Sequence, residues 1–76
     1  MIYIISMSKI QSILFDKKYF NTDKARNWLK KNNFKPIKRV HITKNFLRYR
    51  ILYPSKAYGF RIINFGKHIK AVVMFR

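Results

Sequence analysis

The chain has 76 residues, with 18 Lys and Arg against two acidic residues, a formal net charge of +16 at pH 7 and no cysteine. This length holds one domain, and the lack of cysteine excludes disulfides and thiolate metal sites, which often stabilise small folds. A hydrophobic share of 49% is too high for a disordered basic tail, so the sequence predicts a small folded domain with a strong positive field.

The first seven residues are expected to be a short N-terminal extension or an edge strand, and residues 8–76 a single basic α+β domain. The apolar run from Ile2 to Ile5 is too short for a signal-peptide core. No stretch of the sequence approaches the ~20 apolar residues that span a membrane. Met7 is followed by Ser8 and Lys9 and is a second plausible start of the protein.

Residues 9–15 have the composition of a strand, and the polar residues 16–18 predict a turn after it. A helix is predicted within residues 20–33, capped by Asn21 or Thr22. Asp23 places an acid in the first turn, and an apolar stripe is formed by Ala25, Trp28 and Leu29. A left-handed stop is expected at Asn32 and Asn33, and Pro36 follows the helix.

After this helix the apolar period changes to two, which is typical of strands. The predicted strands cover residues 37–42, 46–53, 58–64 and 70–75, with turns at 43–45, 54–57 and 65–67. The fold class is therefore α+β, with one helix packed on an antiparallel sheet of three to five strands in the order β-α-β-β-β-β. We expect Trp28 and Leu29 to meet the sheet face that carries Tyr49, Ile51 and the last strand.

The residue types that carry catalysis are scarce, so no enzymatic activity, cofactor, metal or small-molecule substrate is expected. The two acids fit a turn and a helix start, and the two histidines fit half-exposed strand positions. Neither pair has the spacing of metal ligands. The two glycines do not form a phosphate-binding loop. These residues are Asp16, Asp23, His41, His68, Gly59 and Gly66.

The positive charge gathers in groups along the chain. Arg48 and Arg50 stand two apart on one predicted strand and therefore project from the same sheet face. They point into solvent if the helix covers the other face, and Arg61 joins them if the strand register allows it. The candidate nucleic-acid-binding residues are Arg48, Arg50, Arg61, Lys56, Lys38, Arg39, Lys30 and Lys31.

Aromatic residues near these cations have two interpretations. They can stack on bases, as on sheet platforms that bind single strands, or fill the core. Core filling is the favoured interpretation, because they fall on the predicted core face or near strand ends. The four aromatics are Tyr49, Tyr53, Tyr58 and Phe60.

Over residues 8–75 the sequence resembles a small basic domain of uncharacterised proteins from large DNA viruses and phages. The resemblance rests on Phe15, Phe20, Ala25, Trp28, Leu29, Lys35, Pro36, Thr43, Asn45, Arg48, Arg50, Gly66 and Ile69. It implies a viral source and no assigned activity. An intracellular protein is expected, in a virion or in the nucleus of an infected cell if the resemblance holds.

The favoured hypothesis is a nucleic-acid-binding protein that contacts backbone phosphates of DNA or RNA without reading sequence, for genome packing or a nucleoprotein complex. No zinc finger, helix-turn-helix or RNA-recognition motif is present to read bases. The alternative is an interaction or minor virion protein that docks on an acidic protein surface. A third hypothesis is a component of a large RNA–protein particle. No membrane partner is expected.

Overall fold

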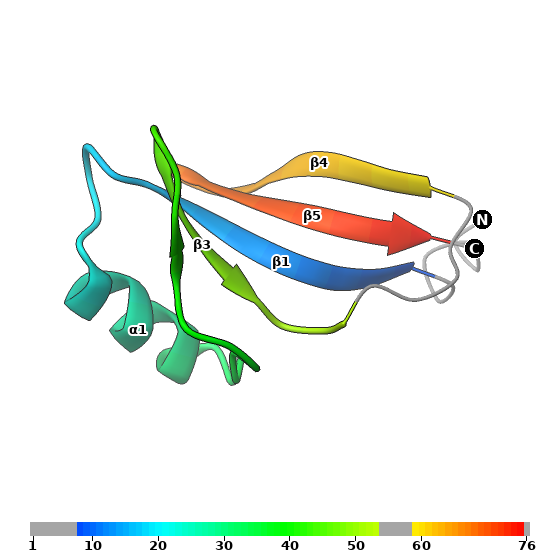
Figure 1. Ribbon diagram of the computed structural model, residues 1–76, viewed down its shortest axis with the longest axis horizontal. Coiled ribbons are helices and arrows are strands. Elements are labelled where there is room, and N and C mark those ends of the chain that lie inside the picture. The colour runs from blue at the N-terminus through cyan, green and yellow to red at the C-terminus, as the bar shows by residue number, and fades with distance from the viewer. Residues whose placement is uncertain (1–7, 54–58, 76) are drawn as a thin grey trace.

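A computed structural model of the chain describes residues 8–53 and 59–75 (Figure 1). It confirms an α+β fold with the element order β-α-β-β-β-β. The elements are β1 (Ser8–Asp16), α1 (Thr22–Lys31), β2 (His41–Ile42), β3 (Phe46–Arg50), β4 (Gly59–Gly66) and β5 (Ile69–Phe75). Among the described residues, no helix is long and apolar enough to cross a membrane.

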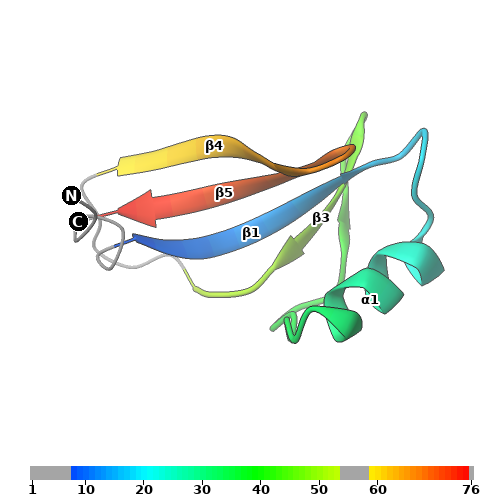
Figure 2. The same cartoon turned by 180° about the vertical axis from the view of Figure 1, so that it is seen from behind.

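The five strands form one sheet in the order β2-β3-β1-β5-β4, and every neighbouring pair is antiparallel. The helix α1 lies against one face at one end of the sheet, while β1, β4 and β5 extend beyond it (Figures 1 and 2). Strand register assigns side chains to the two faces. The sheet face that α1 covers, called the helix face below, carries Ile13, Phe15, Leu47, Tyr49, Ile69 and Ala71. The opposite sheet face carries Ser12, Leu14, Arg48, Arg50 and Lys70.

The ends of α1 follow the signals in the sequence. The Asn21 side chain accepts a hydrogen bond from the Lys24 backbone N–H at 2.8 Å, which caps the N-terminus. At the other end Asn33 has a φ of 63°, the left-handed conformation that reverses the chain after a helix. The Phe34 N–H then reaches the Leu29 carbonyl at 2.8 Å, and the Asn33 N–H reaches the Lys30 carbonyl at 3.2 Å. This pair of bonds closes the helix.

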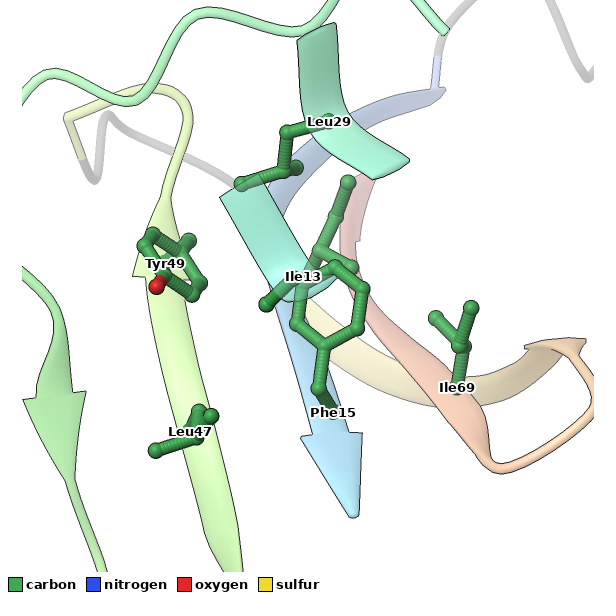
Figure 3. Close-up of a cluster of buried hydrophobic side chains, with 7 residues drawn as sticks. Ile13, Phe15, Leu29, Leu47, Tyr49 and Ile69 are labelled. Atoms are coloured by element: carbon green, nitrogen blue, oxygen red, sulfur yellow. The ribbon is translucent and has the colours of Figure 1, made fainter. Parts of the chain in front are cut away.

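The core lies between α1 and the helix face (Figure 3). Phe15 is fully buried at its centre, and its ring centroid lies 5.0 Å from Phe20, 5.6 Å from Trp28 and 5.7 Å from Tyr49. Ala25 and Leu29, two members of the predicted apolar stripe, are also buried. The helix is therefore held by its narrow apolar face, as the spacing predicts.

Several boundaries differ from the expectation. The strand predicted at 37–42 is confined to His41 and Ile42, because the Ile37 N–H already bonds to the Arg50 carbonyl at 2.9 Å outside a regular ladder. The strand predicted at 46–53 ends at Arg50. Beyond Arg50, the backbone N–H groups of Ile51 and Leu52 both donate to the carbonyl of Gln11, the residue at which the register of β1 against β5 shifts.

Two further differences concern the ends of the elements. The turn between β4 and β5 is formed by Lys67 and His68, so His68 is a turn residue with a φ of 63° rather than a strand residue. Phe65 belongs to β4 and packs against the rings of Trp28 and Phe34. The predicted N-terminal extension or edge strand of residues 1–7, the predicted loop 54–57 and Tyr58 lie outside the described residues.

Candidate functional site

A basic groove lies between α1 and the segment of residues 34–40, with Tyr49 of β3 also lining it. Its volume is about 1450 Å³. The groove is partly open to solvent, whereas small-molecule sites bury most of their ligand, so a larger ligand is the better fit. The cations that line the basic groove are Arg26, Lys30, Lys35, Lys38 and Arg39.

Local sequence explains why two separate segments face each other across this groove. Arg26 and Lys30 are four residues apart on α1, so they lie on one side of the helix. The left-handed Asn33 turns the chain back, and the ring of Phe34 stacks on Trp28 with centroids 6.0 Å apart. The following segment therefore runs beside the helix instead of leaving it.

The groove is strongly electropositive. Its five cations are all exposed, and Asp23 is the one acid among the described residues that line it. Fixed charges of one sign along a cleft raise the local concentration of an oppositely charged ligand. The Lys38 ammonium also lies 5.6 Å from the centroid of the exposed Tyr53 ring. This cation–π contact helps to hold Lys38 in place in the 34–40 segment.

Tyr49 contributes the one buried polar group that we identify in the groove. The residue is 3% exposed, and its hydroxyl has no hydrogen-bond partner in the described structure. Burial raises the pKa of the Tyr49 phenol, the Arg26 charge opposes that rise and the Asp23 charge adds to it. With its pKa raised, the phenol keeps its proton at neutral pH and is a hydrogen-bond donor.

The structure divides the predicted binding residues among several places. Lys30, Lys38 and Arg39 line the basic groove, whereas Lys31 is exposed on α1 but does not line it. Lys56 lies outside the described residues. The candidate set omitted two groove cations, Arg26 and Lys35. The i, i+4 spacing of Arg26 and Lys30 was the signal that could have added the first of these.

Arg48 and Arg50 do project from the same face, opposite α1, as their spacing predicts. The expectation that they simply point into solvent is wrong, since both are half-buried. Arg48 donates from Nε to Ser12 Oγ at 3.2 Å and from Nη2 to Gln11 Oε1 at 3.0 Å. Its guanidinium is therefore part of a hydrogen-bonded network over the centre of the sheet.

Arg61 does not join these two arginines. Arg61 pairs with Val73. The row of the sheet that holds Arg50 runs through Ser12 and Val72 to Ile62, the next residue after Arg61. Side chains alternate between faces along a strand, so Arg61 lies on the helix face and the Arg50 row lies on the other. The predicted binding residues that the structure describes thus do not make one continuous surface.

The aromatic residues divide between the two interpretations. Tyr49 is buried in the core, as favoured. Core filling is wrong for Tyr53 and Phe60, which are 62% and 54% exposed, because β3 has ended before Tyr53 and β4 is an edge strand. Tyr58 lies outside the described residues.

The histidines show no arrangement for metal binding. In the described part of the chain, no three His, Asp or Glu side chains gather where they could hold a metal ion. His68 stacks on Tyr19 with ring centroids 3.5 Å apart, and His41 is exposed in β2.

Comparisons of this chain with protein families, with curated proteins and with solved structures found no match. The viral resemblance therefore rests on the sequence pattern alone, and the function has to be argued from the chain itself.

Proposed function

We propose that the chain binds nucleic acid through backbone phosphates, without reading base sequence, and that the basic groove is the contact. The observation that supports this most is the convergence of five exposed cations from two segments on one open groove. Lys and Arg contacts to phosphate oxygens position a protein on a nucleic acid but carry no sequence information.

The charge balance of the whole chain supports a polyanionic partner. A net charge of +16 on 76 residues repels itself in the compact state, and a polyanion offsets that repulsion. Binding would also release the counterions condensed on the nucleic acid, which gives affinity in proportion to the number of phosphates neutralised. The several cations that line the groove suit a backbone with repeated phosphates.

The experiment compares two triple variants that remove the same charge. Lys30→Gln, Lys35→Gln and Lys38→Gln remove three of the five cations from the basic groove. Lys18→Gln, Lys44→Gln and Lys67→Gln remove three exposed lysines from turns elsewhere. Affinity for a DNA duplex is measured over a range of salt concentrations. We expect the groove variant to flatten the log–log salt slope by about 2.7, at about 0.9 for each phosphate contact.

The control variant should keep most of the slope, because its lysines do not line the groove. An equal effect of both variants would show that bulk charge, and not the groove, carries the binding. A larger effect of the control would place the contact at the turns. If neither the wild type nor the variants bind duplex or single-stranded nucleic acid, the proposal is wrong and an acidic protein is the better candidate partner.

A further inference from the structure

We propose that the hydroxyl of Tyr49 donates a hydrogen bond to a phosphate oxygen, so that the groove holds one phosphate of the bound nucleic acid in a fixed position. This inference rests on the proposed function and adds to it one defined phosphate-binding site, called the phosphate seat below. A seat of this kind differs from attraction by mobile surface lysines, because one donor comes from the rigid sheet.

The first support is the unpartnered hydroxyl. Tyr49 is 97% buried by area, since its exposed fraction is 3%, and its oxygen has no partner in the described structure. Buried polar groups almost always have a hydrogen-bond partner, and an exception is explained by strain, by a functional role or by an absent ligand or water. Here the side chain lines a basic groove, which favours an anionic ligand.

The position of the ring gives the second support. Tyr49 is the last but one residue of β3, paired with Ile13 of β1, and its ring packs edge-on against Phe15 at 5.7 Å. Figure 3 shows Tyr49 on the opposite side of the core from Ile69, with its oxygen at the outer end of the ring. The ring is thus fixed by core packing, and a hydroxyl fixed in this way is preorganised for a ligand.

The surroundings supply the charge that a phosphate needs. The Arg26 charge opposes the rise in the pKa of the Tyr49 phenol, and four further cations line the same groove. Guanidinium and ammonium groups combined with a neutral hydroxyl donor are a common set for phosphate oxygens. The oxygen is shielded from water in the described structure, so the atoms that cover it must move aside when a phosphate enters.

Arg50 Nε is the other buried side-chain atom without a partner in the described residues. It lies on the sheet face opposite α1 and does not line the groove. It therefore supports no site with the groove cations, and Tyr49 is the residue to test.

The test is Tyr49→Phe, which removes the hydroxyl oxygen and keeps the ring. We expect affinity for a DNA duplex to fall about tenfold, as for one hydrogen bond to a charged group. The salt slope should stay unchanged, since no cation is lost. The melting temperature of the free protein should not fall, because the hydroxyl makes no bond in it. Tyr19→Phe, at an exposed tyrosine outside the groove, is the matched control and should bind as wild type.

The outcomes separate this inference from the function on which it rests. If the triple lysine variant flattens the slope while Tyr49→Phe binds as wild type, the phosphate seat is wrong and the groove remains the interface. A lower melting temperature for Tyr49→Phe would show that the hydroxyl already has a partner inside the protein, which also overturns the seat.

Inorganic pyrophosphate serves as the small probe. Binding of the duplex that is much tighter than that of pyrophosphate supports a seat for the nucleic-acid backbone. Tighter binding of pyrophosphate, weakened by Tyr49→Phe, would assign the seat to a free phosphate compound and overturn the nucleic-acid assignment.

Discussion

The Arg48 guanidinium on β3 donates a hydrogen bond from Nε to the hydroxyl of Ser12 on β1, at 3.2 Å. Ser12 is fully buried and in turn donates to the Gln11 side chain. Gln11 closes the network by accepting from Arg48 and donating to the Leu52 carbonyl at 3.0 Å. A strand arginine that the sequence pattern assigns to solvent is thus a structural residue.

Arg48→Ala is therefore expected to lower stability by about 1–3 kcal/mol, because the buried side chains of Gln11 and Ser12 each lose the hydrogen bond that they accept from Arg48. The measurement is urea unfolding of the wild type and the variant. Arg39→Ala, at an exposed cation of the groove, is the control and should change stability little. Equal stability of Arg48→Ala and wild type would show that the network does not stabilise the fold.

The N-terminal cap of α1 gives a second prediction. Asn21→Ala removes the acceptor of the Lys24 N–H and should cost about 0.5–2 kcal/mol. Asn27→Ala, at an exposed position inside the same helix, should be neutral or slightly stabilising, because alanine is the better helix former. Thermal unfolding followed by circular dichroism compares the two. A cap variant no less stable than the control would contradict the capping role.

Phe15 is the side chain on which the core depends most. Phe15→Ala should cost about 3–5 kcal/mol, a large part of the stability of so small a domain, because the ring contacts both Trp28 of α1 and Tyr49 of β3. Phe60→Ala, at a phenylalanine that is 54% exposed on the edge strand β4, should cost much less. Denaturant midpoints of both variants check this order. A reversal would place the core elsewhere.

The raised pKa of Tyr49 predicts a pH dependence of stability. Its pKa in the folded chain lies above the ordinary tyrosine value of 10.0. Above pH 10 the unfolded chain therefore loses this proton before the folded chain does, and stability falls with increasing pH. Below that range both states keep the proton and no effect is expected. Comparing the stability of wild type and Tyr49→Phe at pH 8 and pH 11 isolates this tyrosine, and an unchanged difference would contradict the shift.

The sequence predicts those features that depend on neighbouring residues. Asn21, the stripe of Ala25 and Leu29, and the stop at Asn33 all act where their patterns place them, since capping, periodicity and left-handed geometry are local. The hairpin at 43–45 was also predictable, because Thr43 and Asn45 favour turns. These local signals are sufficient for the fold class.

Features that depend on strand order and register could not be predicted from the sequence. The face of Arg61 is decided by its pairing with Val73, and the exposure of Phe60 by the place of β4 at the sheet edge. The groove required the return of residues 34–40 beside α1, which is a tertiary arrangement. Charge clusters alone therefore indicated a basic protein but not which of its cations share a surface.

The most direct test of the central claim is the salt dependence of binding to two DNA duplexes of equal length and unrelated sequence. If the five groove cations each meet a phosphate, the slope of log affinity against log salt concentration should be about −4.5 for both duplexes, with equal affinities. A slope near zero, or a strong preference for one sequence, would contradict binding through backbone phosphates.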